Sequence, residues 1–415
     1  MRRWALLAVG LGLALPSGNA AAGEPAPPES AAPTAPAEAS GAASPDASAP
    51  DAPIVELITM GAGDDLFEKF GHAAMCLVHD RGKRRTICFN YGTTDFESVQ
   101  SLVWDFLRGR SEFWVSTTTR GRMIASYRAA DRTVWRQILP LSPGQALEME
   151  GLLLDNAREE NRYYQYDHYR DNCSSRLRDL IDEVTRGALS AATDSEIQDM
   201  TYRELTRRGF ADSAVLLLAS DLLVGRATDR RPTTYDAMFL PEVLRAQVEA
   251  RFGAHPTIFH ERRGRAFPVD AGMGGRWVWV VLALAFAAPV AAARRTGRRE
   301  RLAIAAAAIP LALIGVVLWT VALATTMPEL RWNEAVLVFL PTDAALPFLP
   351  ALWRARYAAA RVALLAVVTL LLAIGVFHQP LWLLVPMPFL TMFLVALPRR
   401  APATSAVVPE LAAPG

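Results

Sequence analysis

Apolar positions gather in two parts of the 415-residue chain, the first 15 residues and the part that follows Trp277. Residues 53–270 between them show short apolar runs of mixed period, which is typical of a folded α+β domain. Residues 23–52 consist mostly of Ala, Pro, Ser and acidic residues. We expect an extended, disordered linker there, because such a composition cannot build a core.

The N-terminus has the order of a secretory signal peptide. Two arginines come first, an apolar run follows from Trp4 to Leu15, and small residues continue to Ala22. The run is shorter than the ~20 residues that a membrane span needs. The sequence therefore predicts that residues 1–22 are a signal peptide and that residues 53–270 fold outside the cytoplasmic membrane.

Clusters of arginine separate the apolar stretches that follow Trp277. They fall between the first and second stretches, between the third and fourth, and after the fifth, and such clusters stay on the cytoplasmic side. This pattern predicts an all-α bundle of about five transmembrane helices over 277–398 and a cytoplasmic tail at 399–415. The apolar stretches are 277–293, 302–324, 335–352, 359–377 and 380–398.

The third stretch is interrupted by Asp343 and three prolines. It could instead be re-entrant, which would leave four spans. An acidic side chain at membrane depth is costly and indicates a functional or water-facing position. The alternative places Asp343 at the membrane interface.

Residues 53–270 predict a small antiparallel sheet with several helices. Ser142 and Pro143 supply an N-cap and a first-turn residue for one helix, and a charged segment around Gly82 predicts a hairpin turn. The expected strands are Ile54–Met60, His72–Val78, 86–91, 111–118 and 134–141, and the expected helices are 96–108, 143–160, 174–186 and 201–208.

The chain has three cysteines, and an odd number in an exported protein leaves at least one thiol unpaired. If the hairpin turn centres near Gly82, Cys76 faces Cys88. The sequence leaves two alternatives for this pair: a disulfide, or two small buried side chains that are not bonded to each other. Cys173 is left alone.

Cys173 directly precedes a helical stripe of apolar residues. It therefore lies at or just before a helix N-terminus, with Asn172 or Ser174 as the cap. The helix dipole and free N–H groups there favour a thiolate and can receive an oxyanion. The alternative is a free cysteine that is buried under a Tyr-rich surface.

A nucleophilic thiol needs a base, and His72 and His168 are the best placed of the six histidines. His72 begins a strand after Gly71, which permits close approach of another segment. In the expected hairpin register Asn90 lies diagonal to His72 on the same face. An amide there would orient the imidazole, the third role of a catalytic triad. The alternative for His72 is a core histidine.

These residues are similar to those of circularly permuted papain-like thiol enzymes, which include the lecithin–retinol acyltransferase group and place the His before the Cys. More closely, residues 54–398 resemble the Lnb-type bacterial lipoprotein N-acyltransferases. The matching segments are Phe70-Gly71-His72-Ala73-Ala74, Phe89-Asn90-Tyr91-Gly92-Thr93, Phe106-Leu107-Arg108-Gly109, Asp171-Asn172-Cys173-Ser174-Ser175-Arg176 and Phe239-Leu240-Pro241.

The resemblance implies that Cys173 is the nucleophile and His72 the general base, with Asn90 as the orienting residue inferred from the hairpin. Cys173 would attack a phospholipid ester, and the thioester would acylate the α-amine of a diacylglyceryl-cysteine lipoprotein. The protein would span the bacterial inner membrane with its catalytic domain in the periplasm.

Substrate contact or oxyanion stabilisation is expected from Asn172, Ser174 and Tyr166. Tyr166 also belongs to a group of aromatic residues that form either a surface at the level of the lipid headgroups or ordinary packing. The group is Tyr163, Tyr164, Tyr166, Tyr169, Trp104 and Trp114.

Two other functions compete with acyl transfer: a membrane-anchored thiol hydrolase of peptide or amide bonds in the envelope, and a non-enzymatic assembly factor. A net charge of +1 provides no strongly basic surface for nucleic acid. No cofactor is expected. Cys173, His168 and Asp167 lack the spacing of a zinc site.

Overall fold

A computed structural model describes residues 52–79, 86–94, 99–268 and 270–398. The predicted signal peptide, nearly all of the predicted linker, the turn around Gly82, the start of the helix expected at 96–108 and the predicted cytoplasmic tail lie outside these ranges.

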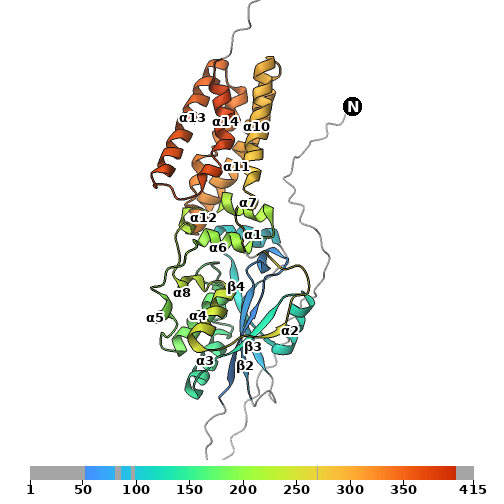
Figure 1. The fold of residues 1–415 in the computed structure, drawn as a ribbon, viewed down its shortest axis with the longest axis vertical. Helices are drawn as coiled ribbons and strands as arrows, with labels where there is room; N and C mark the ends of the chain where they lie inside the picture. The colour runs from blue at the N-terminus through green and yellow to red at the C-terminus, as the bar shows by residue number, and fades with distance from the viewer. Residues whose placement is uncertain (1–51, 80–85, 95–98, 269, 399–415) are drawn as a thin grey trace, which may run out of the picture. The chain divides into compact units, whose positions relative to one another are not determined.

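The described residues contain one antiparallel sheet of seven strands, in the order β6-β4-β3-β2-β1-β5-β7, so that β2 is central (Figure 1). All five expected strands are present within a few residues of their predicted ends. β6 and β7 were missed because three or four residues are too few to show an alternation. The strands are β1 Ile54–Met60, β2 His72–Val78, β3 Ile87–Thr93, β4 Glu112–Thr119, β5 Val134–Ile138, β6 Tyr163–Gln165 and β7 Thr257–His260.

Helices cover both faces of the sheet. Leu57 and Met75 face a core that is shared with α3, α4 and α9, while Ile58 and Cys76 pack with Met123 of α2 on the other face. The Ser142 cap is confirmed as a capping box with Gln145 at the start of α3. The helices are α1 Val99–Arg108, α2 Arg120–Ala129, α3 Pro143–Asn156, α4 Cys173–Val184, α5 Ser190–Thr193, α6 Tyr202–Gly209, α7 Ala214–Leu223, α8 Thr234–Ala237 and α9 Pro241–Phe252, with short 3-10 helices η1 Leu66–Glu68 and η3 Arg226–Thr228.

The predicted register of the β2–β3 hairpin is confirmed. Ala74 pairs with Asn90, and Cys76 pairs with Cys88. The two cysteines form a disulfide in which both residues are fully buried. Cys173 is the free cysteine of the described residues, as expected.

Three helices of the described residues are long and apolar enough to cross a membrane. They are α10 Trp277–Thr296, α11 Glu300–Ala324 and α13 Ala351–Ala373. The prediction of about five spanning helices is therefore confirmed only for these three. Of the other two apolar stretches, one forms the 3-10 helices η4 Glu334–Leu337 and η5 Pro341–Phe348, and the other forms η6 Leu381–Leu383 and the short α14 Pro386–Ala396.

Several prolines gather in each of these two stretches, whereas the long helices α10 and α11 each contain a single internal proline. Pro341, Pro347 and Pro350 interrupt one stretch, and Pro380, Pro386 and Pro388 interrupt the other. Each proline lacks the N–H that a continuous helix needs. The irregular η5 packs against α11, and α14 packs against α10 and α13. Non-helical backbone is tolerated at membrane depth when protein surrounds it.

Asp343 is fully buried within the protein. Arg361 of α13 donates to both of its carboxylate oxygens, at 2.8 and 3.0 Å, and Tyr357 donates at 2.7 Å. Arg361 also donates to the Val338 carbonyl at 2.7 Å. The pair therefore attaches the irregular segment to α13, and Arg361 is not part of an exposed basic cluster as the sequence suggested.

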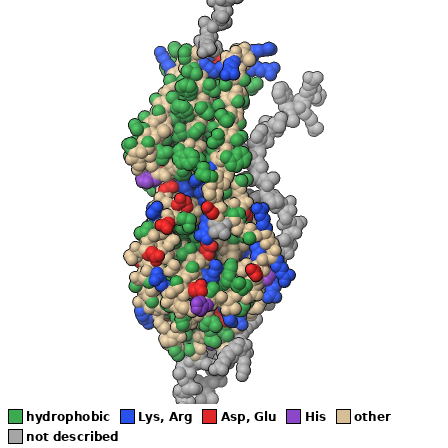
Figure 2. Space-filling view, viewed as in Figure 1, with side chains coloured by type: hydrophobic (Ala, Val, Ile, Leu, Met, Phe, Trp, Pro, Cys, Tyr) green, Lys and Arg blue, Asp and Glu red, His purple; other side chains and the backbone are tan. Residues whose placement is uncertain are grey.

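The exposed arginines mark one end of the bundle. Figure 2 shows Lys and Arg side chains gathered at the end of the apolar surface that is distant from the sheet. The Arg294 guanidinium donates to the carbonyls of Val395 and Leu397, so the end of α14 lies beside the α10–α11 connection. The exposed arginines of this connection are Arg295, Arg298, Arg299 and Arg301.

We expect the disulfide to stabilise the sheet domain without taking part in chemistry. Replacing both cysteines, Cys76→Ala with Cys88→Ala, should lower the free energy of unfolding by about 3 kcal/mol. This is the loss expected when a disulfide that closes a short loop no longer restricts the unfolded chain. Thermal unfolding of the purified protein in detergent measures this. An unchanged melting temperature would contradict it.

The buried ion pair should be sensitive to the loss of one partner. Arg361→Met leaves the Asp343 carboxylate buried without its cation, which should cost about 3–5 kcal/mol. Arg356→Met, on the exposed side of the same helix, is the matched control and should have little effect. Asp343→Leu combined with Arg361→Met should recover much of the loss in melting temperature. Equal melting temperatures for the two single variants would contradict the assignment.

Candidate active site

The cap of α4 places Cys173 at the first position of the helix. The Asn172 Oδ1 accepts hydrogen bonds from the N–H groups of Ser174 and Ser175, at 2.8 and 2.9 Å. Its Nδ2 donates to the carbonyls of His168 and Phe239, at 2.7 and 2.9 Å. The prediction of Asn172 as N-cap is thus confirmed. Because both amide hydrogens are used, its side chain has no donor left for a substrate.

The Ser174 side chain also makes a hydrogen bond inside the protein. Its fully buried hydroxyl donates to the Met238 carbonyl at 2.7 Å. The Asn172 and Ser174 side chains thus attach the start of α4 to the segment 238–239. The expectation that these residues contact substrate or the oxyanion stays a prediction, which for Ser174 rests on its backbone N–H. Tyr166 keeps a place at the site, where its ring stacks on Phe113 at 4.3 Å.

His72 begins β2 directly after a glycine with a left-handed backbone conformation. Gly71 has a φ of +80°, and a Cβ there would lie 2.6 Å from the Met60 carbonyl oxygen, so only glycine fits. The Asn90 side chain lies within hydrogen-bonding reach of the imidazole, as the hairpin register predicted. The ring of Tyr127 stacks on the other side, with centroids 6.1 Å apart. These neighbours hold the imidazole in one orientation.

The thiol and the imidazole line the same cavity. The backbone N–H of Ala73 reaches the Cys173 sulfur. The sulfur therefore lies beside the peptide group that joins His72 to Ala73. The N–H groups of Cys173 and Ser174 also point toward it. The site therefore combines a thiol, an oriented imidazole and helix N–H groups, the parts that acyl transfer through a thioester requires.

Burial keeps both groups neutral. It raises the pKa of the Cys173 thiol to about 11, although the nearby N–H groups and the Arg132 guanidinium act in the opposite direction. Burial, followed by the charge of Arg132, lowers the pKa of His72 to about 4. The helix N–H groups act toward the thiolate, as expected, but desolvation outweighs them.

Arg132 is the residue of this site that sequence reasoning missed. It is buried, donates to the Gly61 carbonyl at 2.9 Å and pairs with Glu68 at 2.7 Å. Its charge acts on both Cys173 and His72. It precedes β5 in the sequence, and no local pattern links it to either residue.

His168, the other candidate base, is held differently. Its ring packs edge-on against Phe70 and Phe239, at 4.4 and 5.4 Å between centroids. Burial lowers its pKa to about 4. Its Nε2 has no hydrogen-bond partner among the described residues. His168 therefore lacks the orienting amide that His72 has.

The aromatic residues that sequence analysis grouped are divided by the structure. Tyr164 is a buried packing residue, and Tyr163 and Trp104 are exposed. Tyr166 and the buried Tyr169 line the cavity. They therefore do not form one surface.

The cavity that contains Cys173 and His72 has a volume of about 290 Å³. Its wall is largely apolar and includes Phe70, Phe106 and Phe239 of the sheet domain. Met327 and Leu330, from the connection between α11 and η4, complete the wall. A neighbouring hollow of about 360 Å³ is larger and more polar, but neither the thiol nor the imidazole lines it.

The sheet domain contacts the connection between α11 and η4 at two places. The first is the Phe106-Leu107-Arg108-Gly109 segment. Gly109 has a φ of +67°, and a Cβ there would lie 2.5 Å from the Thr326 Oγ1. The Arg108 carbonyl accepts hydrogen bonds from the N–H and the hydroxyl of Thr326, at 3.2 and 3.0 Å. The segment therefore forms part of a docking contact.

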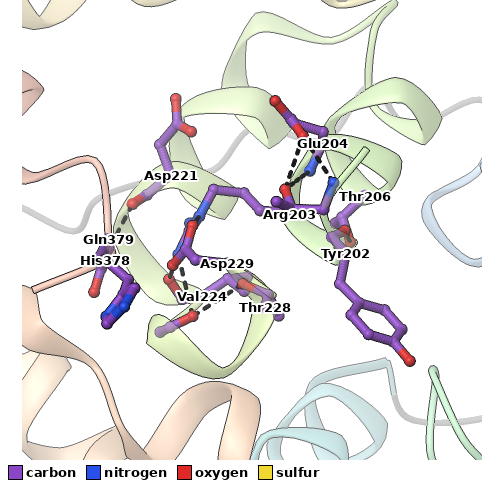
Figure 3. A network of polar contacts seen from close by, with 12 residues as sticks. Tyr202, Arg203, Glu204, Thr206, Asp221, Val224, Thr228, Asp229, His378 and Gln379 are labelled. Atoms are coloured by element: carbon purple, nitrogen blue, oxygen red, sulfur yellow. Dashed lines mark hydrogen bonds and ion pairs between the residues drawn. The ribbon is translucent and has the colours of Figure 1, made fainter. Parts of the chain in front are cut away.

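The second place is a polar network around Arg203 of α6 (Figure 3). The buried Arg203 pairs with Asp229 at 2.7 Å and donates to the carbonyls of Val224 and Gly225, at 2.7 and 3.1 Å. The Gly225 N–H then donates to the Glu329 carbonyl at 2.6 Å. Gln379, which precedes η6, donates to the Asp221 carbonyl nearby, at 3.4 Å.

Comparison with known families identifies the first part of the chain. Residues 46–208 match the family described as the Lnb N-terminal periplasmic domain. No curated protein and no solved structure matches the chain. The chain therefore combines a periplasmic domain of the Lnb type with helices suited to a membrane. The matched range includes both His72 and Cys173.

The raised pKa of Cys173 predicts the pH dependence of its alkylation. The thiolate is the reactive form, so iodoacetamide should react slowly at pH 7 and with a midpoint near pH 11. Mass spectrometry of the Cys173 peptide over a pH series measures this. Denatured protein is the control and should show the ordinary midpoint of about 8.5. A midpoint below 8.5 in the folded protein would indicate a preformed thiolate and contradict the prediction.

Proposed function

We propose that this protein is a lipoprotein N-acyltransferase of the bacterial inner membrane, with its catalytic domain in the periplasm. The observation that carries the proposal is the composition of the cavity. It joins Cys173 and His72 to an apolar wall, and part of that wall is the Met327–Leu330 connection between membrane-type helices. A thiol at that position can meet the ester of a lipid whose acyl chains remain beside the bundle.

The first half-reaction forms a thioester. His72 takes the thiol proton while the Cys173 sulfur attacks the ester carbonyl of a phospholipid. The tetrahedral intermediate then breaks at the carbon–oxygen bond, and the lysophospholipid leaves with the proton from His72. The acyl chain stays on the sulfur.

The second half-reaction transfers the acyl chain to an amine. The neutral α-amine of a diacylglyceryl-cysteine attacks the thioester, and His72 accepts a proton from the attacking nitrogen. The carbon–sulfur bond breaks, and the Cys173 thiol is restored with that proton. The products are an amide on the lipoprotein and the free enzyme.

Backbone groups provide the stabilisation of the oxyanion. The first N–H groups of a helix have no partner within the helix, and those of Cys173 and Ser174 point toward the sulfur. The Ser174 N–H is shared with the Asn172 side chain, so the Cys173 N–H is the better donor. Donors that are already in place in a water-poor cavity cost no reorganisation during the reaction.

Neutral resting groups suit this reaction. A buried thiolate–imidazolium pair would be costly in an apolar wall. With the pKa of Cys173 raised and that of His72 lowered, proton transfer accompanies the attack. The thiol is activated when the ester carbonyl is in place.

Substitution of the thiol and the imidazole tests the proposal. Cys173→Ala should abolish both lysophospholipid release and N-acylation of a reporter lipoprotein. His72→Gln should lower both by about 10²–10⁴-fold, the usual contribution of a general base. Mass spectrometry of the lipoprotein N-terminal peptide and of the lipids measures the two products.

His168→Gln is the matched control, since His168 lies in the same cavity without an orienting amide, and its effect should be much smaller than that of His72→Gln. Full N-acylation by Cys173→Ala would refute the proposal. Cleavage of muropeptides by the wild-type protein, without acyl transfer, would favour a thiol hydrolase instead.

A further inference from the structure

One charged side chain lines the active-site cavity. Among the described residues of its wall, Glu329 is the only Asp, Glu, Lys or Arg. The two histidines of the wall, His72 and His168, stay neutral because burial lowers the pKa of each to about 4. The charge of Glu329 is therefore not balanced by another residue of the wall.

Glu329 is buried but incompletely paired. Its residue is 4% exposed. Its Oε1 accepts a hydrogen bond from Arg170, and its Oε2 has no partner among the described residues. A buried carboxylate oxygen without a partner is costly, so a donor that arrives with a substrate would relieve that cost.

The surrounding charges leave a net negative site. Arg170 bonds to Asp167 at 3.0 Å as well as to Glu329. One cation is thus shared by two anions, and the group carries one excess negative charge. Such a site favours a cation over an anion or a neutral group.

The position of Glu329 is fixed from the sheet domain. Its backbone carbonyl accepts the Gly225 N–H, and Arg203 donates to the Gly225 carbonyl. Leu330, next in the chain, packs with Met327 and Val321. The carboxylate is therefore held at the part of the wall that the connection between α11 and η4 contributes.

We propose that Glu329 binds the primary ammonium group of a lipid-linked substrate. This inference rests on the proposed acyl transfer. Two such groups belong to that reaction: the α-ammonium of the diacylglyceryl-cysteine acceptor and the headgroup ammonium of an ethanolamine phospholipid donor. In either case the ammonium donates to Oε2 while the acyl chains occupy the apolar wall. An α-ammonium then passes one proton to the Glu329 carboxylate before its neutral nitrogen attacks the thioester.

Measuring the two half-reactions separately shows which of the two ammonium groups Glu329 binds. The experiment uses the full-length protein with Glu329→Gln, and with ethanolamine or glycerol phospholipid as donor. If the acceptor amine binds, acyl-enzyme formation should stay near wild type with both donors, and transfer to a diacylglyceryl peptide should fall about tenfold to a hundredfold. If the headgroup binds, acyl-enzyme formation should fall with the ethanolamine lipid alone.

Two outcomes would overturn the inference. In one, Glu329→Gln matches wild type in both half-reactions with both donors. In the other, acyl-enzyme formation falls equally with both lipids, which would mean that Glu329 only supports the fold. Glu334→Gln is the matched control. Glu334 is also a buried carboxylate of this connection, it accepts the Gln379 N–H at 2.9 Å, and it lies outside the cavity wall.

A binding measurement keeps the inference testable if Glu329→Gln does not fold. Cys173→Ala retains Glu329 and cannot form the thioester. It should bind a diacylglyceryl peptide with a free α-amine, or an ethanolamine lipid, about tenfold more tightly than the N-acetylated form of the same molecule. Equal affinities for free and acetylated forms of both would refute it. This preference for the free amine is measurable even if the wild-type protein transfers no acyl group. Failure of the proposed acyl transfer can therefore be told apart from failure of ammonium binding by Glu329.

Discussion

The Asn172 side chain makes four hydrogen bonds, two as acceptor to N–H groups of α4 and two as donor to the carbonyls of His168 and Phe239. The position of Cys173 depends on them, because they join the helix N-terminus to the segments on both sides of it. An amide is suited to this role since it offers two donors and accepts at one oxygen. A carboxylate there would leave both carbonyls unpaired.

The second constraint is burial. The reacting groups lie in an apolar cavity, and desolvation has a larger effect on their protonation than the helix N–H groups or Arg132. The site therefore resembles a neutral acid–base pair more than a thiolate–imidazolium pair. Its reactivity depends on alignment of the substrate carbonyl, which a rigid oriented imidazole and preorganised N–H donors provide.

The sheet domain and the helical bundle form a continuous structure at the active site. The Phe106–Gly109 segment, the Arg203 network and α7 all contact residues of the bundle. All three bond to the connection between α11 and η4. This connection supplies Met327, Glu329 and Leu330 to the cavity. The bundle thus contributes to the wall of the site, which is more than an anchor would do.

The sequence alone determined what depends on local pattern. Hairpin symmetry around Gly82 predicted that Cys76 faces Cys88 and that Asn90 lies near His72, since strand pairing has a strict period of two. The Ser142 and Asn172 caps and the placement of Cys173 at a helix start followed from short-range hydrogen-bonding rules.

Tertiary structure decided the rest. Arg132 and Glu329 reach the site from distant segments that no sequence spacing connects to Cys173 or His72. The resting protonation of the thiol depends on how deeply α4 is buried. Asp343 becomes a structural residue only through Arg361, which lies 18 positions away. The two shortened apolar stretches remain in the bundle because neighbouring helices surround them, whereas hydropathy alone suggested five similar spans.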